Sequence, residues 1–182
     1  MTASPSLDRR QLDALMDRLN NTACVVTTAY KGQLAGCFVT FVTGCSLEPP
    51  RLLVLTSHEN LTHELVKRSG VMTVHLVPRG REEWIRHFGY QSGRDVDKFA
   101  NLDWEAGVTG SPILPDALGH VEGRVLNSMD CGDHTARLLE PVVARLRDFD
   151  VVPLTTFEIL ARGLEEPRVP PAGPWTGYNS EQ

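Results

Sequence analysis

The loop from Thr56 to Thr62 holds the residues best suited to bind an anion. It follows an apolar run and leads into a predicted helix that starts after Asn60. Exposed N–H groups and the positive end of the helix dipole favour a phosphate there, even without a lysine. The side chains of Ser57, Asn60 and Thr62 add donors. A capped helix that binds nothing gives the same pattern and is commoner, so the residues alone leave both interpretations open.

A second candidate is the segment Cys37-Phe38-Val39-Thr40-Phe41. If one edge of this strand is not fully paired, its backbone N–H and C=O groups can bind a planar heterocycle. An ordinary core strand would have the same composition, and that alternative stays open.

The third candidate is the tetrapeptide Gly132-Asp133-His134-Thr135. A histidine that follows a tight turn at the mouth of a hairpin is well placed to meet a ligand. The alternative is a plain turn in which Asp133 bonds its own backbone and His134 is merely exposed. We expect no metal site, because His58 and His63 are five residues apart and neither HxH nor HxxxH occurs beside a carboxylate. The sequence also lacks the GxSxG, Walker and Rossmann glycine motifs.

The composition is that of a globular domain with an acidic balance. The 182 residues are 41% hydrophobic and 23% charged, with a net charge of -5. Broad binding to a nucleic acid needs a basic face, so we expect no nucleic-acid partner. The four cysteines form no CxxC pair, which predicts buried free thiols in a reducing cytoplasm. No stretch reaches the roughly 20 apolar residues of a membrane span, and the N-terminus lacks the apolar centre of a signal peptide. We therefore expect a cytoplasmic protein without a membrane contact.

The elements that must position these candidates are mostly strands. Helical periodicity covers residues 7–19, with Leu12, Leu15, Met16 and Leu19 on one stripe. A second helix is predicted over 61–68, with Asn60 as its N-cap and Gly70 as its stop. Residues 82–88 resemble a short helix, and 154–162 are either a helix or a strand with a turn. Strands are predicted over residues 24–30, 34–43, 51–55, 71–77, 117–129 and 134–145.

This order of elements predicts one mostly β domain, a β-barrel with peripheral helices. Residues 1–20 would form an N-terminal helix packed on the domain. The domain itself would cover residues 21–165, and residues 166–182 would form an extended C-terminal tail.

The candidates, taken together, resemble the flavin reductase-like family, the FMN-binding split-barrel proteins. The resemblance runs in order from about Asn21 to Ala144, and no single motif in it is specific. Its parts are Val25-Val26-Thr27-Thr28, Gly36, Ser46-Leu47-Glu48-Pro49-Pro50, the loop 56–62, Ser69-Gly70-Val71, Asp97-Lys98-Phe99, the run 110–114 and Gly132-Asp133-His134-Thr135.

The resemblance implies a non-covalently bound flavin, FMN with FAD as the alternative, and NADH or NADPH as co-substrate. It also implies a homodimer, and some members serve a partner monooxygenase. It assigns the isoalloxazine ring to Cys37, Phe38, Val39 and Thr40, and the phosphate and ribityl chain to Thr56, Ser57, His58, Asn60, Leu61 and Thr62. Lys98 and Phe99 would close over the flavin. His134 would be the catalytic-site residue, orienting the nicotinamide or its phosphate without acid–base work.

This chain departs from the family pattern in the strand that lines the ring. The family often reads Thr-Val-Ser-Ser where this sequence reads Phe38-Val39-Thr40-Phe41. Two hydroxyls are replaced by phenyl groups, which removes hydrogen bonds to the ring edge but leaves backbone contacts. The part after Ala144 matches poorly, which leaves the substrate open.

Two functions follow from this reading. The first is an NAD(P)H:FMN reductase, in which the two cofactors carry the hydride chemistry and the protein stacks them and supplies a donor near the reduced ring. The second is an FMN-binding electron-transfer protein without a nicotinamide site of its own. The phenyl groups of Phe38 and Phe41 slightly favour the second. The apolar stripe of the first helix supports the homodimer.

Overall fold

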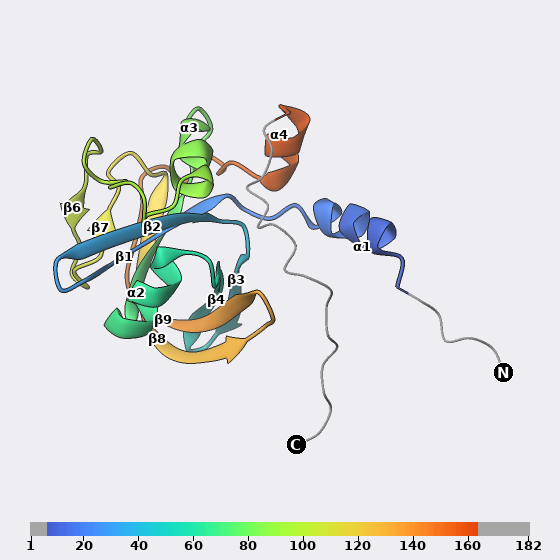
Figure 1. Ribbon diagram of the computed structural model, residues 1–182. Coiled ribbons are helices and arrows are strands. Elements are labelled where there is room, and N and C mark those ends of the chain that lie inside the picture. Colours follow the sequence, from blue (N-terminus) through green and yellow to red (C-terminus); the bar gives the residue numbers. More distant parts are fainter. Residues whose placement is uncertain (1–6, 164–182) are drawn as a thin grey trace, which may run out of the picture.

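A seven-stranded antiparallel sheet forms the body of the molecule (Figure 1). The computed structural model describes residues 7–163, so the predicted tail at 166–182 lies outside the described residues. The strand order is β2-β1-β5-β8-β9-β4-β3. The strands are β1 (Cys24–Tyr30), β2 (Gln33–Val39), β3 (Val42–Leu47), β4 (Pro50–Ser57), β5 (Val71–Leu76), β8 (Gly119–Asp130) and β9 (His134–Leu146).

The sheet closes on itself at the short link between β2 and β3. These two strands lie at opposite ends of the strand order, yet only Thr40 and Phe41 separate them in sequence. A link of two residues spans at most about 10 Å, so the sheet must curl until its edges meet. The predicted barrel is confirmed in this form. The single strand predicted over 34–43 is wrong, because the chain leaves one edge at Val39 and pairs with β4 from Val42 onward.

Burial on both faces explains the weak alternation of the central strands. Val25 of β1 belongs to one buried cluster with Trp84 and Phe88, whereas Val26 belongs to a second cluster with Met72 and Leu139. A strand that is covered on both sides has no polar face to show. The predicted turn at Lys31–Gly32 is confirmed, with φ of 49° and 82°.

Helix α2 (Leu61–Ser69) lies across β1 and β2 and supplies one wall of the domain (Figure 1). Its residues Leu61, Thr62, Leu65 and Val66 are buried. Gly70 ends it in the left-handed conformation, as predicted, with φ of 69°. Asn60 occupies the N-cap position, but its side chain makes no capping hydrogen bond.

The remaining elements are short. Helix α3 (Glu83–Ile85) continues as the π-helix η2 (Arg86–Tyr90), and together they bury Trp84, Ile85 and Phe88. The small sheet β6 (Glu105–Ala106) with β7 (Pro112–Ile113) covers part of the main sheet. The undecided segment at 154–162 is the helix α4 (Thr156–Ala161), which starts with a capping box between Thr155 and Glu158.

The N-terminal helix differs from the prediction. Helix α1 (Arg9–Met16) and the following 3₁₀ helix η1 (Asp17–Leu19) contain no buried residue, and α1 extends away from the sheet (Figure 1). Leu15 and Leu19 are each 58% exposed. The expected packing of this helix on the domain is not seen among residues 7–163, because none of them covers its apolar stripe.

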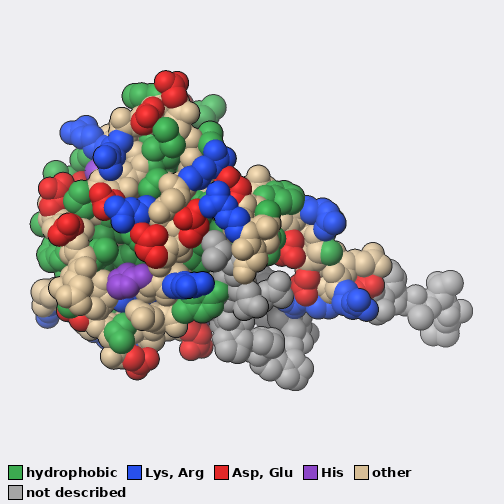
Figure 2. All heavy atoms as spheres, turned by 90° about the horizontal axis from the view of Figure 1, so that it is seen from above, with side chains coloured by type: hydrophobic (Ala, Val, Ile, Leu, Met, Phe, Trp, Pro, Cys, Tyr) green, Lys and Arg blue, Asp and Glu red, His purple; other side chains and the backbone are tan. Residues whose placement is uncertain are grey.

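Two of the four cysteines are exposed, and the surface carries charges of both signs. All four cysteines are free, but only Cys24 and Cys37 are buried, whereas Cys45 and Cys131 are exposed. Figure 2 shows acidic and basic side chains interspersed over the face in view. Within residues 7–163, no helix is long and apolar enough to cross a membrane.

Candidate functional site

Two of the three predicted constellations meet where β4 ends and β9 begins. Ser57 pairs with His134 in the β4–β9 register. The backbone N–H of His58 donates to the carbonyl oxygen of Asp133 at 3.0 Å, and Nε2 of His58 lies 3.0 Å from Oγ1 of Thr135. The loop predicted to bind phosphate and the turn that carries His134 thus form one continuous surface.

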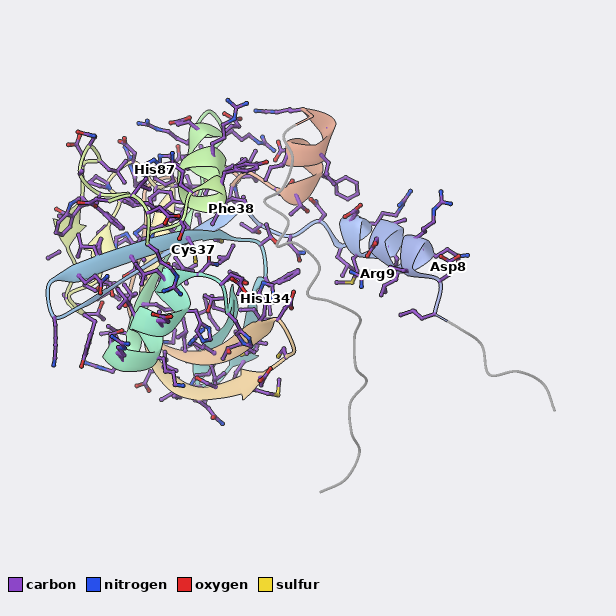
Figure 3. All side chains as sticks on the ribbon, viewed as in Figure 1. Asp8, Arg9, Cys37, Phe38, His87 and His134 are labelled. Atoms are coloured by element: carbon purple, nitrogen blue, oxygen red, sulfur yellow. The ribbon has the colours of Figure 1, made fainter. Side chains whose placement is uncertain are left out.

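Asp133 and Phe41 hold the ring of His134. Nδ1 of His134 lies 2.7 Å from Oδ1 of Asp133, and this hydrogen bond lowers the pKa of the Asp133 carboxyl. Because the carboxylate accepts at Nδ1, Nε2 is left to face a ligand. The edge of Phe41 packs on the same ring, with 5.5 Å between ring centroids. His134 lies at the start of β9, below the labelled residues of β2 in Figure 3.

The strand predicted to line a heterocycle turns two of its side chains inward. Cys37 and Val39 belong to the buried core, at 1% and 7% exposure, and Phe38 packs against the other buried cluster. Thr40 is half-buried. Burial raises the pKa of the Cys37 thiol, which also has a hydrogen bond with Thr62. Cys37 and Val39 can therefore contact a ligand only through their backbone N–H and C=O groups.

The hydroxyls of the predicted phosphate loop are mostly engaged within the protein. Thr56 and Thr62 are buried, and the hydroxyl of Thr56 accepts a hydrogen bond from the guanidinium of Arg137. Ser57 is also buried, and its Oγ accepts from the N–H of Glu59 at 3.3 Å. Leu61 packs in a small apolar cluster. Since Asn60 provides no capping bond, the first N–H groups of α2 are the donors best suited to an anion here.

Lys98 and Phe99 line a cavity of about 400 Å³ between β2 and the segment 93–99. Nζ of Lys98 donates to the carbonyl oxygens of Gly36 at 3.0 Å and Phe88 at 2.8 Å. Burial lowers the pKa of Lys98. This ammonium forms no ion pair with any residue that the structure describes, and it lies 5.9 Å from the centroid of the Phe88 ring.

The cavity adjoins the start of α2. Arg94 forms an ion pair with Glu64 of that helix at 2.8 Å. Gly93 lies so close to Leu61 that a Cβ built on it would be 3.3 Å from Cδ2 of Leu61. The edge of β2, Lys98 and the N-terminus of α2 therefore border one region.

Arg137 is a buried cation that the sequence analysis missed. It is 2% exposed, and Nη2 donates to Nδ1 and to the carbonyl oxygen of His63, at 3.1 Å each. The signal was present in the alternation of β9, because Thr135, Arg137 and Leu139 share a face and Leu139 is fully buried. No group of three His, Cys, Asp or Glu that could hold a metal occurs among residues 7–163.

Comparison with known proteins agrees with the fold. The model of the flavin reductase-like domain matches residues 16–157. The chain belongs to the flavin reductase-like domain family. An FMN reductase (NADH), RutF 2 of Rhizobium rhizogenes, is 33% identical over 148 residues, which are 80% of this chain and 85% of that protein.

Two further members are of interest for their partners and cofactors. The reductase subunit HsaB of a flavin-dependent monooxygenase from Rhodococcus jostii is 29% identical over 72% of this chain and 66% of that subunit. The structure of the NADH:FAD oxidoreductase SgcE6 from Streptomyces globisporus superposes with a TM-score of 0.71. It is 26% identical to this chain, and the match covers 80% of this chain and 87% of SgcE6.

Proposed function

We propose that this protein is an NAD(P)H-dependent flavin reductase that binds FMN without a covalent bond. Hydride transfer itself is chemistry that the nicotinamide and the flavin supply when both are bound. The protein must hold the flavin, favour the negative charge of its reduced form and leave one face open to the nicotinamide. FAD is the alternative flavin, and NADH and NADPH are both candidate co-substrates.

The observation that carries this proposal is the uncompensated ammonium of Lys98 in the cavity beside β2. A buried cation without a counter-ion costs free energy, so its presence points to an anionic or electron-rich ligand. The first N–H groups of α2, which receive no bond from the Asn60 side chain, suit a phosphate, and the backbone of β2 at Gly36 suits the edge of a planar ring. These groups would suit the phosphate and the electron-rich ring edge of FMN.

His134 has a separate role in the proposal. Its ring is fixed by Asp133, and its free nitrogen would orient the nicotinamide or its phosphate group. Because orientation is its task, His134 needs to donate or accept a hydrogen bond and does not need to transfer a proton.

A second function is favoured by one contact. The ring of Phe41, which is 39% exposed, packs on His134, where a nicotinamide would need room. If that phenyl group blocks the nicotinamide, the protein would be an FMN-binding electron-transfer protein reduced by another enzyme.

We extend the proposal to partners by family membership. The reductase would form a homodimer in the cytoplasm, supported by the apolar residues that α1 and α4 leave exposed. It would deliver reduced flavin to a monooxygenase, as the name of the Rhodococcus jostii relative states for that protein.

Replacement of Lys98 tests where the flavin binds. We expect Lys98→Met to raise the Kd for FMN about tenfold or more, which corresponds to the loss of one hydrogen bond from a charged donor. Fluorescence quenching of FMN during titration measures this Kd. Arg68→Met is the control, because Arg68 is exposed and lies outside this cavity. Equal affinities of the wild type and Lys98→Met would place the flavin elsewhere.

A further inference from the structure

A second cavity, of about 430 Å³, lies between α2 and the hairpin of β8 and β9. One wall consists of residues from α2 and its end, and the other of residues from the two strands. The cavity is lined by His63, Val66, Lys67, Gly70, Val125, Ser128, Asp130, Thr135 and Arg137. None of these residues lines the cavity of Lys98. Successive strand residues point to opposite faces, so Thr135 and Arg137 face α2 whereas His134 faces Phe41. The second cavity therefore shares no lining residue with the cavity of Lys98, although Arg137 bonds Thr56 and Thr135 bonds His58 of the predicted phosphate loop.

Arg137 is the unusual feature of this cavity. Its three hydrogen bonds go to neutral groups, namely the hydroxyl of Thr56 and the ring nitrogen and carbonyl oxygen of His63. None of its acceptors among residues 7–163 is a carboxylate. A guanidinium stays charged in a protein, so this is a buried cation without a counter-ion. Such a charge is unfavourable for folding unless an anion compensates it.

The other charged groups around the cavity leave a positive balance. Lys67 contributes a second cation from the exposed side of α2. His63 is neutral, because Arg137 has only donors and so Nδ1 of His63 must accept. Burial and then the charge of Arg137 also lower the pKa of His63. Asp130 is the one acidic lining residue, and its Oδ1 accepts from the N–H of Gly132 at 2.8 Å in the hairpin turn.

We propose that this cavity binds a small organic anion through a carboxylate or phosphate group. Arg137 would hold the anionic oxygens from below, and Lys67 would close over them from the rim. Val66 and Val125 offer an apolar wall to the rest of the ligand. The volume suits a small organic molecule. The proposal rests on this cavity alone and does not depend on flavin binding.

Thermal unfolding of the full chain tests the proposal, with sodium phosphate and sodium benzoate as the two probes and sodium chloride at equal ionic strength as reference. At a probe concentration roughly tenfold above its Kd, we expect Tm to rise by about 3–6 °C. The rise should occur both without FMN and with excess FMN, because the two cavities share no lining residue. A response to phosphate alone, or to benzoate alone, supports the site and identifies the group it prefers.

Two substitutions locate the effect. Lys67→Met should weaken the response several-fold in Kd, whereas Arg68→Met should leave it unchanged, since Arg68 is exposed on the same helix but does not line the cavity. Arg137→Met should abolish the response and leave Tm in anion-free buffer no lower than that of the wild type, because a buried unpaired charge is removed. Should Arg137→Met fail to fold, the Lys67 and Arg68 pair still decides. The proposal is overturned if neither probe exceeds sodium chloride, or if the Lys67 and Arg68 variants respond alike.

Discussion

Three buried polar residues of this domain differ in whether they carry a charge. Lys98 and Arg137 are buried as cations, and each bonds only neutral groups of the described chain. His75 is buried as well, but it is neutral. Nδ1 lies 3.1 Å from the carbonyl oxygen of Val25, and Nε2 accepts from the N–H of Leu114 at 3.1 Å. We infer that Lys98 and Arg137 bind ligands and that His75 stabilises the fold.

His75 makes stability depend on pH. Burial lowers its pKa from 6.5 to about 3. The unfolded chain therefore binds one more proton than the folded chain between these values, and stability falls as the pH falls below about 6.5. The expected contribution is about 1.4 kcal/mol of unfolding free energy per pH unit. Urea unfolding between neutral pH and about pH 4 measures it. His75→Gln should show a shallower slope, and equal slopes for both proteins would contradict this assignment.

Residue types alone indicated part of the site. Polar residues at 56–62 and 132–135 were visible as groups, and the structure brings Ser57 and His134 into register. The inward direction of Cys37 and Val39 was not visible, because a strand covered on both faces has no alternation to read. Arg137 was missed because a single arginine in a strand is usually exposed.

The ends of helices and strands were predicted correctly wherever a local residue determines the end. Gly70 ends α2, and the turn at Lys31–Gly32 joins β1 to β2. The break between β2 and β3 could not be read from the sequence, since Phe41 and Val42 continue the apolar run. It results from closure of the sheet, which is a property of the whole fold.

Strand β2 also depends on one close contact. A Cβ on Gly36 would lie 2.8 Å from Cε1 of Phe88 and 3.2 Å from Cζ of Phe99. Gly36→Ala should therefore cost about 1–3 kcal/mol of unfolding free energy, because two buried rings must move. Gly44→Ala on β3 is the matched control, as nothing lies within 4 Å of its added Cβ. Urea denaturation of both variants checks this, and equal stabilities would show that the rings move freely.

At the scale of the whole molecule, the N-terminal helices expose apolar side chains that no described residue covers. Leu15 and Leu19 are exposed on α1 and η1, and Phe157 and Leu160 of α4 are exposed nearby. The periodicity predicted the helix correctly and left its apolar face to either the same chain or a second one. A second chain is the partner that the homodimer proposal provides.

Light scattering tests the homodimer directly. We expect a mass of about twice 20.1 kDa at micromolar concentration. The double variant Leu15→Glu/Leu19→Glu should be monomeric and folded, because both side chains are exposed and charges there oppose apolar contact. Arg10→Glu changes the net charge by the same amount from the other side of the helix and should remain dimeric. A monomeric wild type would contradict the proposal.

The central claim is that this protein passes hydride from a nicotinamide to a flavin. Steady-state oxidation of NADH and of NADPH, with added FMN and with added FAD, tests it most directly. We predict oxidation that requires both the protein and the flavin, with at least one nicotinamide as donor. Retention of FMN by the purified protein without oxidation of either nicotinamide would contradict the claim and establish the electron-transfer alternative.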